Sequence, residues 1–345
     1  MGASTTLNPY LPAINQADLL GLSGLAVPGR LYFVDGTNGS DTYTGLSGWG
    51  DAFATIQTAV TAASAGDTIL IAPKLIVGTN TDPTDYAETI IIPVTKPGLS
   101  LIGVGRGRTQ GGLPQIKMGS GTTALLTIRA PGCHIKNLGF NGIKSADSTQ
   151  TLVGILLDDD NSTKTAWGTT IDNCHFKNCA GSTGSTNAAA GGAITWSANG
   201  CAWQVLIRGC RFYKNVGDIV LIGTSQTVPQ DVVIEDCIFS GPAANVDCNI
   251  YAGGSGFNGL SVRRCQFQQQ PAIGSGTNHR YIVLATGTVG IIDGCTFACQ
   301  TNTTGGTKIS FKSNGTGATI PTTVHITRCY GQSITASESA EITIA

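Results

Sequence analysis

The chain has 345 residues, of which 12% are charged and 41% are hydrophobic; 47 are glycine and the net charge is −1. So few charges predict no basic face for nucleic acid or for an anionic membrane, and the hydrophobic content argues against a disordered chain. No run of about 18 apolar residues occurs, so we expect no membrane insertion. Abundant glycine, threonine, serine and asparagine favour an all-β protein with many turns.

Residues 1–30 differ from the rest of the chain. Leucine and isoleucine alternate with Pro9, Pro12 and Pro28, and Asp18 and Arg30 are the only charged side chains. Such a segment cannot form a core alone, and its exposure would favour aggregation. We therefore expect an apolar arm that packs on its own chain, on a sister chain or on another protein. Because the arm lacks the features of a secretory signal, we expect the protein to remain where it is made.

A helix is predicted at about 52–65, near the start of a second region that spans residues 31–345. Ile56, Ala59, Val60 and Ala63 share one face of this helix, and Gly66 ends it. A solenoid of strands exposes its core and strand edges at each end. The segment is therefore expected to be a short capping helix.

A short phrase recurs through the rest of the chain: an aliphatic residue, a polar one, a bend residue, then Cys-x-Phe. Asn, Gly or Asp at the bend tolerates the left-handed backbone that a one-residue corner requires, whereas Arg264 and Arg328 fit it poorly. After the bend, Cys and Phe lie on the same face of the next strand. Successive copies of this phrase are 27 to 36 residues apart, which suits one coil of a parallel β-helix.

The repeated cysteines and phenylalanines are expected to form a buried stack, each on its own kind in the coils above and below. A zinc site needs ligands that converge from several directions, and a disulfide needs side chains turned toward each other. A linear file with one cysteine per coil fits neither, so we interpret these thiols as small hydrophobic groups. The predicted stack contains Cys174, Cys210, Cys237, Cys265, Cys295, Cys329, Phe176, Phe212, Phe239, Phe267 and Phe297.

The first coils carry a resemblance to a known superfamily. The segments "YFVDGTNGSD", "AFATIQTAVTAASAGDTILIAP" and "LSLIGVGRGRT", followed by the Cys/Phe coils, are similar to the pectate-lyase-like right-handed parallel β-helix superfamily over about residues 31–335. The resemblance implies a single-stranded, right-handed β-helix. It says little about activity, because that superfamily holds polysaccharide lyases, glycoside hydrolases, adhesins and phage tailspikes.

Candidate catalytic groups are few. If the chain is an enzyme, we expect Asp158, Asp160, Asp218 and Asp247 to supply a carboxylate pair for glycoside hydrolysis, or calcium ligands for a lyase. The alternative is that aspartates at strand ends make turns. No Asp-His pair follows a tryptophan, and His134, His175, His279 and His325 are scattered.

Two further groups of residues are candidates for binding. Asp35, Asn38, Ser40 and Asp41 in "VDGTNGSD" form a weak candidate calcium site, because short oxygen-rich loops bind Ca²⁺; the alternative is a turn. The tryptophans could stack on sugars, although such residues also plug coil ends. These are Trp49, Trp167, Trp196 and Trp203.

The sequence favours a non-enzymatic structural protein of a phage virion, either a capsid decoration or a spike-like surface protein in contact with glycans. We expect it to be made in the host cytoplasm and carried on the virion, with no cofactor apart from possible calcium. Residues 1–30 are expected to bind other virion proteins such as the capsid, and a surface polysaccharide is a further possible partner. A homotrimer is implied by the resemblance to tailspikes. The alternatives are a tailspike-type polysaccharide lyase or glycoside hydrolase, and a bacterial surface adhesin.

Overall fold

A computed structural model describes the solenoid in segments separated by gaps. The described residues are 29–74, 85–105, 112–117, 124–142, 153–159, 166–180, 191–197, 202–223, 228–240, 248–253, 256–269, 280–285, 287–299, 309–313, 323–332 and 335–337. The predicted arm therefore lies outside the described residues, apart from its last two positions.

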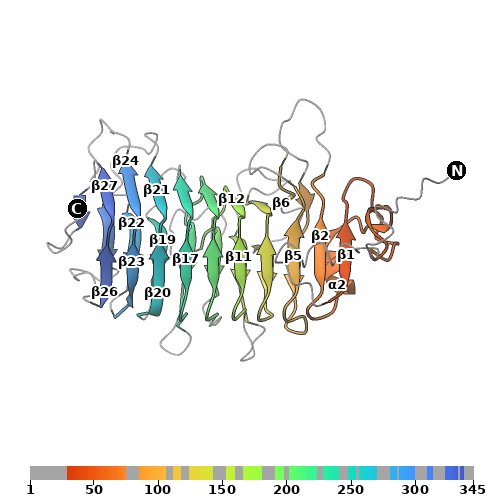
Figure 1. The fold of residues 1–345 in the computed structure, drawn as a ribbon, viewed down its shortest axis with the longest axis horizontal. Coiled ribbons are helices and arrows are strands. Elements are labelled where there is room, and N and C mark those ends of the chain that lie inside the picture. Colours follow the sequence, from red (N-terminus) through yellow and green to blue (C-terminus); the bar gives the residue numbers. More distant parts are fainter. Residues whose placement is uncertain are drawn as a thin grey trace, which may run out of the picture.

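Three parallel sheets wind around one axis (Figure 1). Each coil contributes one strand to each sheet, and the chain advances from coil to coil as a right-handed parallel β-helix. The predicted fold class is confirmed. The first sheet contains β1 (Leu31–Val34), β2 (Thr68–Ile71), β5 (Ser100–Gly103), β8 (His134–Lys136), β11 (Thr170–Asp172), β14 (Leu206–Arg208), β17 (Val233–Glu235), β20 (Asn258–Arg263), β23 (Val289–Asp293) and β26 (Val324–Thr327).

The other two sheets complete each coil. The second sheet contains β3 (Tyr86–Ala87), β6 (Gln115–Lys117), β9 (Gly139–Asn141), β12 (His175–Lys177), β15 (Arg211–Tyr213), β18 (Ile238–Ser240), β21 (Gln266–Gln269), β24 (Thr296–Cys299) and β27 (Tyr330–Gln332). The third sheet contains β4 (Ile90–Ile92), β7 (Ala124–Ile128), β10 (Val153–Leu157), β13 (Ile194–Trp196), β16 (Ile219–Leu221), β19 (Cys248–Ala252), β22 (Arg280–Leu284), β25 (Ile309–Ser313) and β28 (Thr335–Ser337).

In the seven coils from β8 to β27, the corner between the first two sheets is one left-handed residue, which turns the chain sharply at the same place in each coil. Asn137, Asn173 and Gly209 have φ values of 55°, 53° and 63°. Arg264 and Arg328 adopt the same conformation, with φ values of 50° and 51°. The expectation that these two corners differ is therefore wrong, because the position in the coil overrides the low intrinsic preference of arginine for this conformation.

Behind this corner lies the packed interior. Phe140, Phe176, Phe212, Phe239, Phe267 and Phe297 form a column of nearly parallel rings, with centroids 4.6 to 5.2 Å apart. Beside it, the six cysteines of the predicted stack are buried and form no disulfide bond. Each thiol lies 3.6 to 3.8 Å from the carbonyl oxygen of an aliphatic residue in the preceding coil, close enough for a weak S–H···O hydrogen bond.

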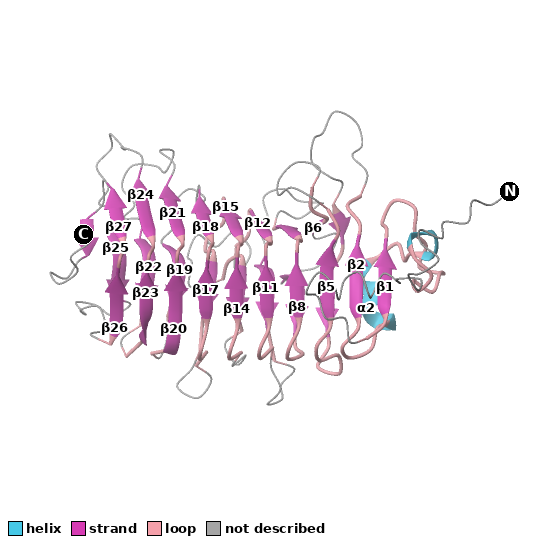
Figure 2. Ribbon diagram, in the orientation of Figure 1, coloured by secondary structure: helices cyan, strands magenta, loops and turns pink. Residues whose placement is uncertain are grey.

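The first coil carries the helix (Figure 2). Helix α2 spans Ile56–Ala62 and follows a short 3-10 helix, η1, at Trp49–Asp51. It is shorter than the predicted 52–65, because Thr55 caps its first turn and Ala63 is already extended. The side chain of Gln57 accepts a hydrogen bond of 2.8 Å from the backbone N–H of Ile91. The helix thus covers the outer edge of β4, where its sheet begins.

No helix among the described residues has both the length and the apolar character needed to cross a membrane.

Candidate functional site

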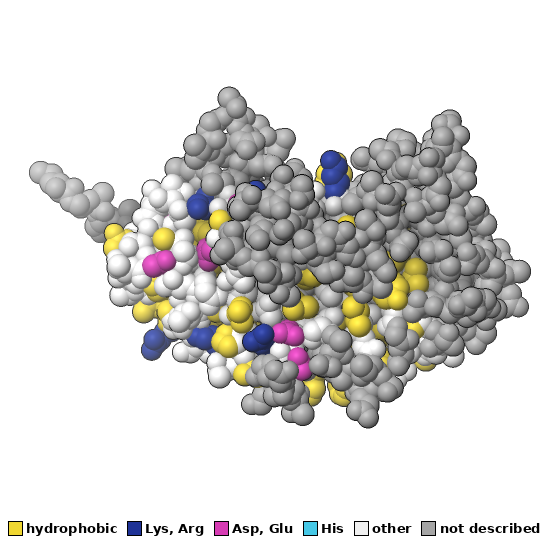
Figure 3. Space-filling view, turned by 180° about the vertical axis from the view of Figure 1, so that it is seen from behind, with side chains coloured by type: hydrophobic (Ala, Val, Ile, Leu, Met, Phe, Trp, Pro, Cys, Tyr) yellow, Lys and Arg dark blue, Asp and Glu magenta, His cyan; other side chains and the backbone are white. Residues whose placement is uncertain are grey.

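The outer face of the third sheet is apolar at its centre. Strand alternation points the next-to-last residue of each strand outward, while its neighbours face the core. Where the side chains are described, these next-to-last residues are aliphatic, threonine or tyrosine, and none is ionisable near neutral pH. Figure 3, seen from behind, shows hydrophobic side chains along the middle of the molecule. The outward residues are Ile91, Thr127, Leu156, Thr195, Val220, Tyr251 and Val283.

Two of the four candidate catalytic aspartates lie in the described part of the chain. Asp158 follows β10, and its Oδ2 accepts a hydrogen bond of 3.0 Å from Nε of Arg129 in the preceding coil. Asp160 and Asp247 lie outside the described residues. At this position the described residues therefore include one candidate carboxylate, that of Asp158, and it is held in an ion pair. They give no distance from it to Asp160 or Asp247.

Asp218, the second described candidate, is a buried group in a polar network. Its side chain accepts hydrogen bonds from the amide of Asn215, at 2.9 Å, and from the amide of Asn249, at 2.7 Å. Burial raises the pKa of Asp218 to about 7, although both amide hydrogen bonds oppose that shift. With only 4% of its surface exposed, the carboxylate serves to join its own coil, through Asn215, to the next coil, through Asn249. Its catalytic role stays a prediction.

The carboxylates of the candidate calcium loop already accept hydrogen bonds from the loop and from the start of helix α2. The carboxylate of Asp35 accepts hydrogen bonds from the backbone N–H groups of Thr37 and Asn38, and from the amide of Asn38 at 3.0 Å. Asp41 accepts hydrogen bonds from the backbone N–H groups of Ala54 and Thr55. A calcium ion would compete with these donors for the same oxygens. Among the described residues, no cluster of three or more His, Cys, Asp or Glu could hold a metal, and the calcium site stays a prediction.

The tryptophans occupy three different environments. Trp49 packs edge-on against Phe33, with ring centroids 5.0 Å apart, and Trp196 is fully buried. Trp167 and Trp203 stack at the corner between the third and first sheets, with ring centroids 5.3 Å apart. Trp167 remains 39% exposed. Trp49 and Trp203 are half-buried, so Trp167 is the most exposed of the four tryptophans. The contact of these residues with sugars stays a prediction.

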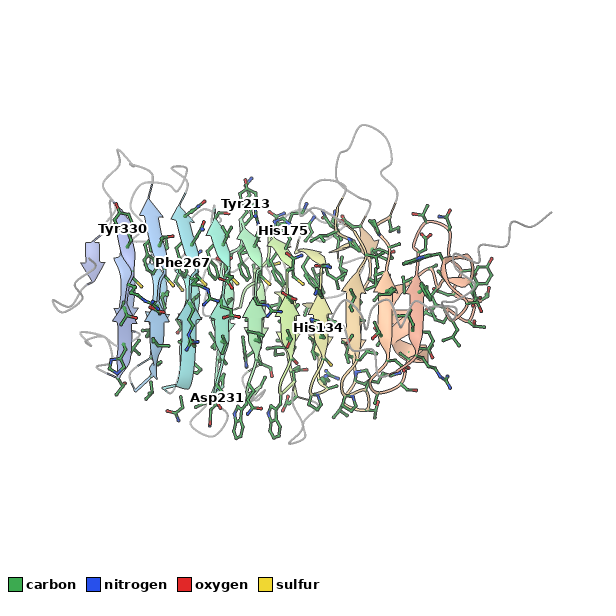
Figure 4. All side chains as sticks on the ribbon, in the orientation of Figure 1. His134, His175, Tyr213, Asp231, Phe267 and Tyr330 are labelled. Atoms are coloured by element: carbon green, nitrogen blue, oxygen red, sulfur yellow. The ribbon has the colours of Figure 1, made fainter. Side chains whose placement is uncertain are left out.

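The histidines do not gather into a site. Figure 4 shows His134 on β8 of the first sheet and His175 on β12 of the second. His175 is buried, although it alternates with the inward-facing Phe176 along β12. His325 is exposed on β26, and His279 lies outside the described residues.

A ladder of charged pairs, which the sequence reading missed, crosses the outer face of the first sheet. Asp172 lies between Lys136, at 3.5 Å, and Arg208, at 3.3 Å, each from a neighbouring coil. Arg264 contacts Asp236 and Glu235 in the same way, and Arg328 contacts Asp293. The sequence does carry a sign of this ladder, because acidic and basic residues alternate from coil to coil at the polar position just before the bend. Only the coil register shows that these residues touch.

The comparisons with known proteins concern architecture. No protein-family model matches the chain, and no curated protein matches it. Among solved structures, ORF18 of Geobacillus virus E2 shares 13% identity over 91% of this chain with a TM-score of 0.47, and this chain covers 59% of that protein's length. A variant of a pectate lyase from Xanthomonas campestris shares 11% identity with a TM-score of 0.42, over 82% of this chain and 79% of that one.

A structure described as a rhamnogalacturonan lyase shares 14% identity with a TM-score of 0.44, over 91% of this chain and 90% of that one. At such identities these similarities do not transfer an activity to this chain. By its own sheets and register, the chain is a right-handed parallel β-helix.

Proposed function

We propose that this chain is a non-enzymatic structural protein of a virus particle, a capsid decoration or spike-like surface component. The observation that supports this most directly is that the described outward positions of the third sheet, from Ile91 to Val283, carry no side chain that ionises near neutral pH. Catalysis of glycoside cleavage requires a pair of ionisable groups beside a bound sugar. The described aspartates are instead held by basic or amide side chains, which suits stability better than proton transfer.

The thiols also support assembly inside a host cell. Nine described cysteines are buried and form no disulfide bond. Burial raises the pKa of Cys133 to about 12, which keeps its thiol protonated and unreactive at neutral pH. A thiol-rich interior without disulfides suits a protein that folds in a reducing cytoplasm, where phage components are made, better than an exported adhesin. In this proposal the protein is a homotrimer and residues 1–30 attach it to the capsid.

Locating the protein on particles tests this function. Antibody labelling of purified virions from the virus that carries the gene, followed by electron microscopy, is expected to place it at the surface. Deletion of residues 1–28 is expected to abolish attachment while the trimer remains intact, as judged by light scattering after size exclusion. If purified particles lack the protein, the proposal is wrong.

An activity screen tests the enzymatic alternative independently. We expect no release of reducing sugar or of unsaturated uronate from a panel of neutral and acidic polysaccharides. Release of either product, abolished by Asp158→Asn but not by Asp51→Asn, would establish a depolymerase instead. Asp51 is a suitable control because it closes a surface turn in the first coil.

A further inference from the structure

A row of prolines and tryptophans follows the corner between the third and first sheets. We call it the proline–tryptophan ridge, and its members are Pro97, Pro131, Trp167 and Trp203. Backbone hydrogen bonds place them in register, because the carbonyl oxygen of each accepts from the residue that follows the equivalent position in the preceding coil. Pro97 and Trp167 are exposed, Trp167 to 39%, and the other two are half-buried. The ridge is thus an apolar edge that runs along the solenoid axis.

A column of residues without side chains runs beside the ridge. Gly98, Gly132 and Gly168 directly follow its first three members, and a Cβ added to any of them would meet no atom closer than 3.5 Å. Their left-handed backbone does not require glycine, since Gln204 and Asp231 adopt it in the next two coils, with φ values of 56° and 53°. Figure 4 shows Asp231 at this corner. Glycine where a larger residue fits leaves room for another backbone to approach closely.

The apolar arm joins the solenoid at the foot of this ridge. Gly29, the first described residue, lies beside Gly66, and the backbone N–H of Arg30 donates a hydrogen bond of 2.7 Å to the carboxylate of Asp67. The register aligns the first residues of β1, β2, β5 and β8. Pro28 stands three residues before this aligned position, as Pro97 and Pro131 do in their own coils. The sequence of the arm therefore leads directly into the ridge.

The part of the arm nearest the ridge repeats leucine at every third residue. Leu19, Leu22 and Leu25 are followed at the same interval by Pro28. In a polyproline II conformation every third residue lies on one face and recurs after about 9.3 Å. Two coils of the solenoid span about 9.6 Å, so the leucine period matches every second position of the ridge. Glycines at 21 and 24 disfavour an α-helix here.

From the ridge, the glycine column and the leucine period, we infer that residues 19–28, which lie outside the described residues, pack along the proline–tryptophan ridge of the same chain in a polyproline II conformation. Measured from Pro28 at about 3.1 Å per residue, Leu25 comes level with Pro97. By the same measure Leu22 comes level with Trp167. The contact removes apolar surface of both partners from water. Residues 1–18 are left for the attachment proposed above, although the inference does not depend on that function.

Two properties of the arm favour its own ridge over that of a second copy. A segment tethered at the foot of the ridge meets it at an effective concentration on the order of millimolar, whereas a sister chain has to be captured first. Residues 19–28 also carry no charged side chain, so docking buries no charge. Asp18, the one charged side chain before Arg30, lies just outside the docked segment.

A photo-crosslinker at residue 22 locates the arm. In the full-length protein Leu22 is replaced by p-benzoylphenylalanine, and the irradiated protein is separated by denaturing electrophoresis and digested for mass spectrometry. We expect a cross-link within one chain, to peptides that contain Pro131 or Trp167. The same group at Tyr10, outside the docked segment, is expected to give no cross-link to the ridge. A cross-link from residue 22 to a second chain or to another face, or the absence of any cross-link, would overturn the inference.

Limited digestion with chymotrypsin, which cleaves after leucine and aromatic residues, measures how firmly the arm is docked. Trp167→Ala removes the most exposed side chain of the ridge. We expect cleavage after Leu22 and Leu25 to accelerate about tenfold, because cleavage follows the undocked population and a tryptophan anchor contributes strongly to binding. Tyr330→Ala, at an exposed aromatic residue in a distant coil, is expected to change the rate less than about twofold.

Circular dichroism and Tm verify that both variants fold, and mass spectrometry of the released peptides identifies the cleavage sites. Equal cleavage rates in wild type and Trp167→Ala would show that the arm does not rest on the ridge. None of these results bears on whether the protein is found on virus particles.

Discussion

The left-handed residue at each corner is where single side chains have the clearest effect on stability. Gly209 has a φ of 63°, and a Cβ added there would meet no atom closer than 3.8 Å. A substitution at this position therefore tests backbone conformation without steric overlap. We expect Gly209→Ala to lower the free energy of unfolding by about 1–2 kcal/mol.

Gly50 provides the control, because it lacks a positive φ and an added Cβ would meet nothing within 4 Å. Gly50→Ala is expected to change stability by less than about 0.5 kcal/mol. Urea unfolding of both variants gives the comparison. Equal effects at the two sites would contradict the conformational explanation.

Asp218 is expected to make stability depend on pH. Its pKa is raised from 3.8 to about 7, so the folded state binds a proton more tightly than the unfolded state. Stability from this group is thus fully present below pH 3.8 and is lost as pH rises toward 7. The loss has an upper bound of about 4 kcal/mol, at 1.36 kcal/mol per pKa unit.

The comparison uses Asp218→Asn, which cannot ionise. Urea unfolding at pH 4.5 and pH 8 is expected to show that wild type loses more stability than the variant across this interval. The difference between the two slopes isolates Asp218 from the other carboxylates, and from any constant cost of the new amide. Parallel pH profiles would mean that the burial of Asp218 does not control its ionisation.

At the scale of the element, the phenylalanine column joins one coil to the next. Phe239 is fully buried and lies 4.8 Å from the ring of Phe212 and 4.6 Å from that of Phe267. Phe239→Ala is expected to destabilise the protein by about 3–5 kcal/mol, because the rigid neighbouring rings cannot close the cavity. Thermal and urea unfolding provide the measurement, and Tyr43→Ala, at a side chain that is 45% exposed, provides the control. A small effect at Phe239 would show that the column repacks.

The helix shows how an element is bounded by its surroundings. Periodicity located its apolar face correctly, since Ile56, Ala59 and Val60 are fully buried. Its length was overestimated, because propensity continues into Ala63 while the chain must straighten there to enter β2. The carboxylate of Glu88, from another coil, accepts hydrogen bonds from the first N–H groups of the helix, and no local pattern predicts that contact.

On the scale of the whole molecule, stability is expected to be nearly additive along the axis, as in other repeat proteins. Deleting residues 210–236 removes one 27-residue coil and joins Gly209 to Cys237, which keeps the corner followed by Cys-x-Phe. We expect this variant to fold cooperatively with a lower Tm and an unchanged β-type circular dichroism spectrum.

A half-coil deletion, residues 210–222, provides the control. It removes fewer residues but breaks the register of all three sheets, so we expect it not to fold. If both deletions fold equally well, or if neither folds, the coil is not the unit of this structure.

The sequence by itself determined the coil, because burial of every second residue and a left-handed corner are local demands that recur in each repeat and leave a visible period. It also placed Cys and Phe on the same inward face of one strand. Only the tertiary structure decided which charges meet, since Lys136, Asp172 and Arg208 follow one another at intervals of 36 residues along the chain and become neighbours through coil register alone.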